Sequence, residues 1–93
     1  VMIMQYEDKN DLSDKELDMR RAIDSLNEEM GAVNAYIQRA KASNDESLKK
    51  ILLHHSKEEK EHAAMLIEWI RRQDPEFDHE LKDYVFTEKE ISH

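Results

Sequence analysis

The sequence lacks cysteine and contains one glycine and one proline in 93 residues. Without cysteine, the chain forms neither a disulfide framework nor a thiolate zinc site. Helix-breaking residues are scarce and aromatic residues make up only 6% of the chain, a composition that suits long helices and not a β-sheet. We therefore predict an all-α protein, and the length predicts a single domain over residues 1–93.

Basic residues are also scarce, since 14 Lys and Arg face 22 Asp and Glu, giving a net charge of -8. This balance argues against a nucleic-acid partner, because phosphate binding requires a basic patch, whereas an acidic surface attracts cations. No apolar run reaches membrane-spanning length, and the opening Val1–Met4 is too short for a signal-peptide core. We expect no membrane partner and a cytoplasmic location.

Local signals divide the chain into two long helices and one short helix. A capping-box pattern, S-x-x-E, begins at Ser13 and predicts a helix over about 14–42. A short polar turn follows, then a second helix over about 45–73, and an Asp-Pro pair predicts a short third helix over about 75–85. Two long helices joined by a tight turn form an antiparallel hairpin. Because the chain is small and rich in charged residues, it can bury only a small core by itself, and we therefore expect it to self-associate.

The apolar stripe of the second predicted helix is interrupted near its middle. Leucines and Trp69 recur at steps of three and four, but three positions of this series carry imidazole or carboxylate groups: His55, Glu59 and His62. Glu29 lies on the inner face of the first predicted helix, and the hairpin places it within roughly 6 Å of the level of Glu59 and His62. Buried carboxylates cost several kcal/mol unless they are paired or bind a metal.

These residues predict a metal site shared between two chains. The Glu-x-x-His spacing alone is weak because glutamate is abundant here, but Glu29 at the same level and the absence of a basic residue on the stripe favour a cation. Two carboxylates and one imidazole underfill a dinuclear site. Two hairpins related by a two-fold axis supply the full ligand set of a ferritin-like four-helix bundle. Oxygen and imidazole donors suit iron or manganese and tolerate zinc.

Four segments carry a family resemblance: MRRAI, EEMGAVNAYIQR, HHSKEEKEHAAMLIEWIRR and YVFTE. Over Met19–Phe86 the chain resembles the encapsulated ferritins, and EEKEHAAM followed by EWIRR is the most specific part. The resemblance implies a two-helix subunit, a ferroxidase centre at a homodimer interface, and a ring-shaped decamer of five dimers. It further implies a cargo protein that oxidises Fe(II) inside an encapsulin shell, where the iron is stored, since the open ring cannot hold mineral itself.

The resemblance also assigns residues. The family's ferroxidase ligands fall on Glu29, Glu59 and His62. A tyrosine beside them falls on Tyr36, whose phenol could hydrogen-bond a ligand carboxylate, although Tyr36 also reads as an ordinary core residue.

The family's outer metal-entry site is only partly present. Its first acidic residue matches Glu28, but Gly31 stands in place of a second acidic residue and Ala35 in place of a tryptophan. This departure weakens the entry site. His54, Glu58 and Glu61 lie on one flank of the second predicted helix and could bind peripheral calcium, manganese or zinc. Ordinary solvated carboxylates are the competing interpretation for Glu28 and for these glutamates.

Two other functions remain open at this stage. The first is a non-enzymatic helical hairpin that oligomerises through its apolar seam, with the polar centre fixing the register. The second keeps the dinuclear site but uses manganese or peroxide. No shell-targeting peptide is visible before His93, and the sequence leaves open whether such a segment or a fused shell protein follows.

Overall fold

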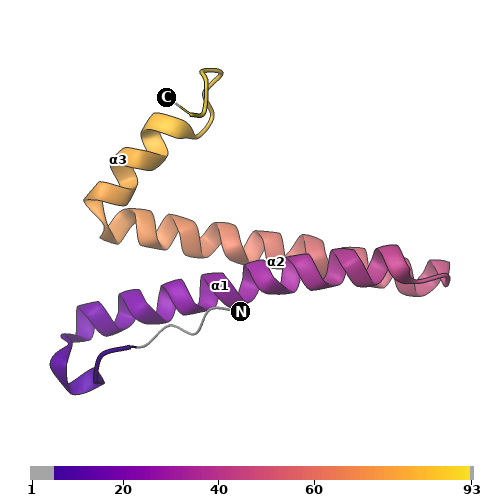
Figure 1. Ribbon diagram of the computed structural model, residues 1–93, viewed down its shortest axis with the longest axis horizontal. Helices are drawn as coiled ribbons and strands as arrows, with labels where there is room; N and C mark the ends of the chain where they lie inside the picture. Colours follow the sequence, from indigo (N-terminus) through magenta and orange to yellow (C-terminus); the bar gives the residue numbers. More distant parts are fainter. Residues whose placement is uncertain (1–5, 93) are drawn as a thin grey trace.

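The computed structural model describes residues 6–92, so the opening Val1–Met4 segment lies outside the described residues. Its elements, in chain order, are a short 3-10 helix, η1 (Lys9–Asp11), and three α-helices, α1 (Asp14–Ala42), α2 (Glu46–Gln73) and α3 (Pro75–Tyr84). The two long helices lie side by side as a hairpin and the short one leaves its end (Figure 1). The predicted all-α class, with a two-helix hairpin and a short third helix, is confirmed. Across residues 6–92, none of the helices combines the length and apolar character needed to cross a membrane.

Side-chain caps fix the two ends of the hairpin. The Glu16 amide donates to the Ser13 hydroxyl at 3.1 Å, and the Ser13 amide donates to the Glu16 carboxylate at 2.9 Å, which completes the capping box at the start of α1. These two hydrogen bonds lower the pKa of Glu16. The Asp45 carboxylate accepts from the Leu48 amide at 2.8 Å and starts α2. The turn between the helices is therefore short, which sets α1 and α2 antiparallel.

The contact between α1 and α2 buries mostly small residues. Ala22, Val33, Ala40, Ser56, Ala63 and Ile70 are the buried residues of the described part of the chain. The larger apolar side chains are instead exposed by between 37% and 59% along both helices: Ile23, Met30, Ile37, Leu48, Ile51, Leu53, Met65 and Trp69. The hairpin thus leaves much of its apolar surface uncovered.

Global dimensions lead to the same conclusion. The radius of gyration is 16.8 Å, whereas a compact domain of this length has about 12 Å. The chain exposes 7969 Å² to solvent, whereas a compact monomer of its mass exposes about 5,700 Å². A single chain is therefore more extended, and exposes more of its surface, than a compact monomer of its size.

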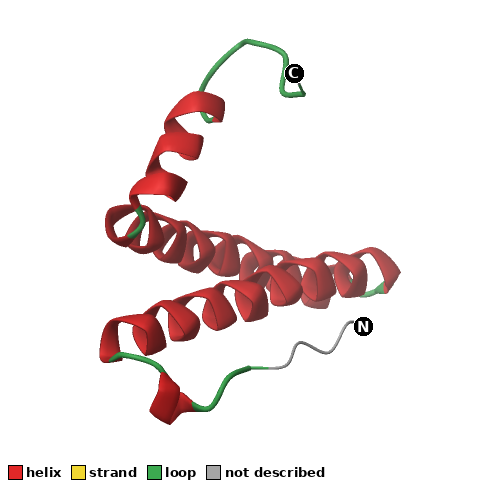
Figure 2. Ribbon diagram, turned by 60° about the vertical axis from the view of Figure 1, so that its left-hand side comes forward, coloured by secondary structure: helices red, strands yellow, loops and turns green. Residues whose placement is uncertain are grey.

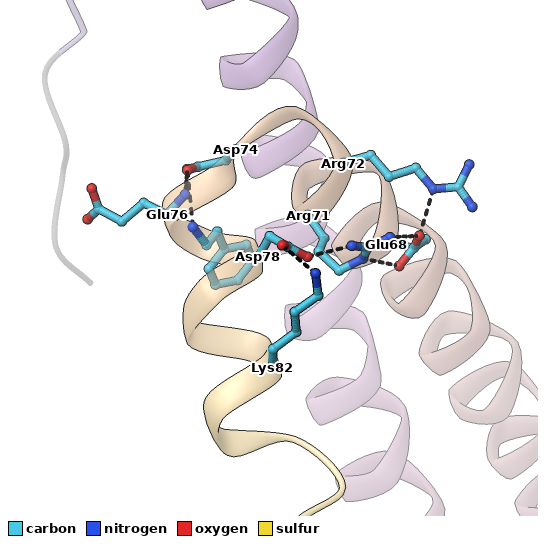
Figure 3. A network of polar contacts seen from close by, with 8 residues as sticks. Glu68, Arg71, Arg72, Asp74, Glu76, Asp78 and Lys82 are labelled. Carbon is cyan, nitrogen blue, oxygen red and sulfur yellow. Dashed lines mark hydrogen bonds and ion pairs between the residues drawn. The ribbon is translucent and has the colours of Figure 1, made fainter.

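Helix α3 is held against α2 by ionic contacts and points away from the hairpin in both views (Figures 1 and 2). Arg71 of α2 donates to Glu68 on its own helix and to Asp78 on α3. Arg72 also donates to Glu68, and Lys82 pairs with Asp78 at 2.9 Å (Figure 3). The Arg71 guanidinium is therefore the bridge that sets the direction of α3.

This bridge should weaken in acid. Hydrogen bonds from Arg71 and Arg72 lower the pKa of Glu68 to about 2 from 4.5, and Lys82 and Arg71 lower the pKa of Asp78. Because folding lowers both pKa values, the stabilisation they give is complete above about pH 4.5 and is lost as the pH falls towards about 2. We expect the melting temperature of the Arg71→Gln variant to lie below that of the wild type at about pH 5, and the difference to shrink towards about pH 2. A difference that is the same at both pH values would contradict this role of Arg71.

Candidate metal centre

Three potential ligands converge in the groove between the long helices. Glu29 lies on α1, and Glu59 and His62 lie one turn apart on α2. The His62 Nδ1 atom is 3.5 Å from Glu29 Oε2 and 3.5 Å from Glu59 Oε2. One donor atom from each residue lies within 4.8 Å of the other two, and all three side chains are half-buried. The structure thus brings together the three residues that spacing had singled out.

In the part of the chain that the structure describes, the side chains of Glu29, Glu59 and His62 form no hydrogen bond. A distance of 3.5 Å is long for a hydrogen bond between nitrogen and oxygen. The Glu29 Oε2 atom is buried and has no hydrogen-bond partner. A buried, unsatisfied carboxylate oxygen costs free energy that a bound cation would recover. This orphaned oxygen is the observation on this chain that best fits a metal ligand.

Among the described residues 6–92, no lysine or arginine pairs with the Glu29 or Glu59 carboxylate. Within residues 6–92, the ion pairs of Glu29 and Glu59 are both with His62. Other carboxylates of the described chain do meet arginine or lysine, as Glu68 and Asp78 do. The group therefore combines two negative charges, one imidazole and no fixed cation.

Helical register explains why these residues meet. Glu29 belongs to a line of α1 that recurs every seven residues and includes Ala22 and Tyr36. His62 belongs to a line of α2 with the same spacing: Leu48, His55, His62 and Trp69. Seven residues make nearly two full turns, so each line runs along one side of its helix. The antiparallel hairpin sets the two lines beside each other, with Glu29 opposite His62.

The donor set suits a divalent metal of the iron or manganese kind and also admits zinc. One chain offers three donors, however, and most such metals take four to six ligands. The remaining positions must be filled from outside the chain. The group can therefore bind a metal fully only with water, substrate or a second chain.

The predicted peripheral residues are less organised. His54 Nε2 lies 2.8 Å from Glu58 Oε1, one turn further along α2, and both side chains are exposed to solvent. Glu28 and Glu61 are exposed. In the described part of the chain, Glu29, Glu59 and His62 form the group of three donors close enough to hold an ion. Peripheral metal binding stays a prediction.

Two positions of the predicted entry site, Gly31 and Ala35, carry no metal-binding side chain. A Cβ atom added at Gly31 would meet no atom within 4 Å, so the surface there is open. Ala35, one turn further along α1, is half-buried and offers no donor.

Tyr36 has a neighbour that the sequence did not indicate. Its ring packs on the His55 imidazole, with ring centroids 5.0 Å apart, and the Arg39 guanidinium lies 5.5 Å from the ring centroid. Within residues 6–92, its hydroxyl forms no hydrogen bond with Glu29 or Glu59, so the predicted bond to a ligand stays a prediction. The register of the two helices could have predicted this contact. Tyr36 lies seven residues after Glu29 and His55 lies seven residues before His62, so both lie on the same lines as the candidate ligands and on the side nearer the turn.

Known proteins share this sequence and fold. A family model described as EncFtn-like matches residues 4–88, which is most of the chain. The crystal structure of a protein from Nitrosomonas europaea is similar with a TM-score of 0.92 at 60% identity, covering 96% of this chain and 98% of that one.

Two curated relatives are equally similar in sequence. A ferritin-like protein from Thermotoga maritima is 47% identical over 87 residues, which is 94% of this chain and 76% of the relative. An encapsulated ferritin-like protein from Rhodospirillum rubrum is 47% identical over 81 residues, which is 87% of this chain and 58% of the relative. The matched segment thus spans a little over half of the second relative.

Proposed function

This chain belongs to the EncFtn-like family, and on that basis we propose that it is a ferroxidase, which oxidises Fe(II) with dioxygen at a site completed by a second copy of the chain. The observation that carries the proposal is the unpartnered, buried Glu29 Oε2 atom beside Glu59 and His62. Three donors without a fixed cation form a site whose electrostatic cost is removed when Fe(II) binds.

A second copy supplies the missing ligands. Ferritin-like dinuclear bundles take one Glu from each of two helices and a Glu-x-x-His pair from each of the other two. In two copies of this hairpin, each α1 contributes Glu29 and each α2 contributes Glu59 and His62. The exposed apolar side chains beside the site, Leu48, Ile51, Met65 and Trp69 on α2, provide the surface on which the copies meet. This arrangement makes a four-helix bundle from two hairpins.

The chain's residues have distinct parts in the reaction. The Glu29 and Glu59 carboxylates bind the substrate Fe(II) ions and hold two of them near each other, at roughly the 3.5–4 Å typical of two-metal sites. His62 binds through its unprotonated nitrogen, so Fe(II) binding competes with protons and weakens as acid is added. Together the two Fe(II) ions give two electrons to one dioxygen molecule, which takes up two protons and leaves as hydrogen peroxide, and both ions leave as Fe(III).

Titration with Fe(II) tests the proposal directly. We expect oxygen consumption and the absorbance of ferric product to rise together, with rapid oxidation saturating at two Fe(II) per pair of chains. Zn(II), which suits the same donors but has no redox chemistry, is expected to block the rapid phase when added first. Oxidation no faster than in protein-free buffer would refute the proposed activity.

The proposal extends to assembly beyond the dimer. A second exposed apolar stripe runs along α1 and consists of Ile23, Met30 and Ile37. Each of these residues comes directly after a residue of the line that contains Glu29, so the stripe lies about 100° around the helix from that line. A copy seated over the site leaves this stripe for a further copy. A chain with two different self-association faces builds a closed ring when the rotation between successive copies closes, and an open filament when it does not. We place the ring, a decamer by family resemblance, inside an encapsulin shell, as the name of the Rhodospirillum rubrum relative indicates for that protein.

A further inference from the structure

A second pair of side chains lies next to the candidate metal centre along the same groove. The Tyr36 ring on α1 and the His55 ring on α2 have centroids 5.0 Å apart and planes tilted by 54°. This geometry is within the range of about 4.5–7 Å that favourable aromatic pairs adopt. The contact joins the two long helices, so it depends on the hairpin and not on local sequence.

The pair repeats the register of the metal-binding residues. Tyr36 follows Glu29 by seven residues, and His55 precedes His62 by seven. In an antiparallel hairpin, both seven-residue displacements run towards the turn, and each covers about 10 Å along the helix axis. Side chains tilt towards the N-terminus of their helix, so Tyr36 leans back towards Glu29 and His62 leans towards Tyr36. This tendency favours a Tyr36 phenol that extends towards Glu29.

Packing of the hairpin core does not account for His55. Its side chain is exposed in the single chain, and it stands where the stripe of α2 otherwise carries apolar residues. The second copy that completes the metal site would cover this line, which also contains His62 and Trp69. A polar ring at such a position requires a partner once it is covered. The neighbour that the structure gives His55 across the hairpin is the Tyr36 ring, and the Arg39 guanidinium is the other neighbour of the Tyr36 ring.

From this geometry we infer that His55 is a positioning residue, whose ring contact holds the Tyr36 phenol towards the metal-binding layer. The consequence for iron chemistry rests on the proposed function. The contact itself does not, because it is formed by the chain alone. Removing the imidazole frees the Tyr36 ring to turn away from Glu29, whereas another flat ring in its place keeps the contact.

Nuclear magnetic resonance of protein labelled with ¹³C-tyrosine tests the contact, with the Tyr36→Phe variant identifying the Tyr36 signals. In His55→Asn we expect the Tyr36 ring signals to move towards those of a free tyrosine. His54→Asn, a neighbouring histidine that pairs with Glu58 instead, is the matched control and should leave them unchanged. In His55→Phe the signals should stay shifted, because a ring is retained.

Iron oxidation by the same full-length variants tests the consequence. We expect the initial rate to fall roughly ten-fold in His55→Asn at unchanged iron stoichiometry, and to recover in His55→Phe. Tyr36 signals in His55→Asn that equal those of the wild type would overturn the inference, and so would a wild-type rate in that variant. If the wild type itself oxidises no Fe(II), the proposed function fails, and the tyrosine signals alone decide whether His55 positions Tyr36.

Discussion

The His62→Ala variant should lose rapid Fe(II) oxidation while keeping its helical hairpin. The imidazole is the only nitrogen donor of the group and lies 3.5 Å from both carboxylates, so its loss leaves each chain with oxygen ligands alone. Removing a residue that merely supports a ligand costs about 10- to 100-fold in metal affinity or activity, so loss of the ligand itself should cost more than roughly 100-fold. Initial rates at saturating oxygen measure the effect.

His54→Ala provides the matched control for this experiment. His54 lies on the same helix and is exposed, and its contact is with Glu58 outside the candidate site. The His54→Ala variant should oxidise Fe(II) at the wild-type rate. Circular dichroism should show equal helix content in both variants, because neither histidine is buried in the hairpin. Unchanged oxidation in His62→Ala would remove this residue from the site.

Glu59→Gln should have opposite effects on assembly with and without metal. In the proposed dimer, four carboxylates from two copies of Glu29 and Glu59 meet around one site. Two like charges about 4 Å apart repel by about 4 kcal/mol at an effective dielectric of about 20. The neutral amide lowers this repulsion, so the metal-free variant should dimerise roughly ten- to hundred-fold more tightly than the wild type. With Zn(II) present, the order should reverse, because the amide is a poorer ligand.

Analytical ultracentrifugation at equal chain concentration, with and without Zn(II), measures both effects. Zn(II) replaces Fe(II) here so that oxidation does not change the sample during the run. Glu46→Gln carries the same substitution in the first turn of α2, on an exposed side chain far from the site, and should behave as the wild type does in both conditions. If Zn(II) left the dimer population of the wild type unchanged, metal binding and assembly would not be linked.

Local signals predicted the helices and the convergence of Glu29, Glu59 and His62. The capping box at Ser13 and Glu16 is formed by neighbouring residues, so the sequence contains all that is needed to recognise it. Glu29, Glu59 and His62 were identifiable because carboxylates interrupting an apolar stripe are costly without a cation. A tight turn then fixes the level at which α1 and α2 meet. The class of fold and the convergence of the three side chains follow from these short-range rules.

Contacts between elements were less predictable. The direction of α3 depends on the ion pair between Arg71 of α2 and Asp78 of α3. The periodicity of apolar residues along a helix does not predict an ion pair between two helices. The Tyr36–His55 contact follows from register once the hairpin is known, but polar rings on a stripe have no preferred partner in sequence alone. The surface that a second copy covers depends on which exposed apolar side chains face each other, and one chain does not determine this.

Crystals grown without oxygen in the presence of Fe(II), with diffraction recorded on both sides of the iron absorption edge, test the central claim most directly. The account predicts two iron sites between two hairpins, with Glu29, Glu59 and His62 from each copy as the ligands. Iron bound by a single chain, or these three side chains facing open solvent away from any neighbouring copy, would contradict it.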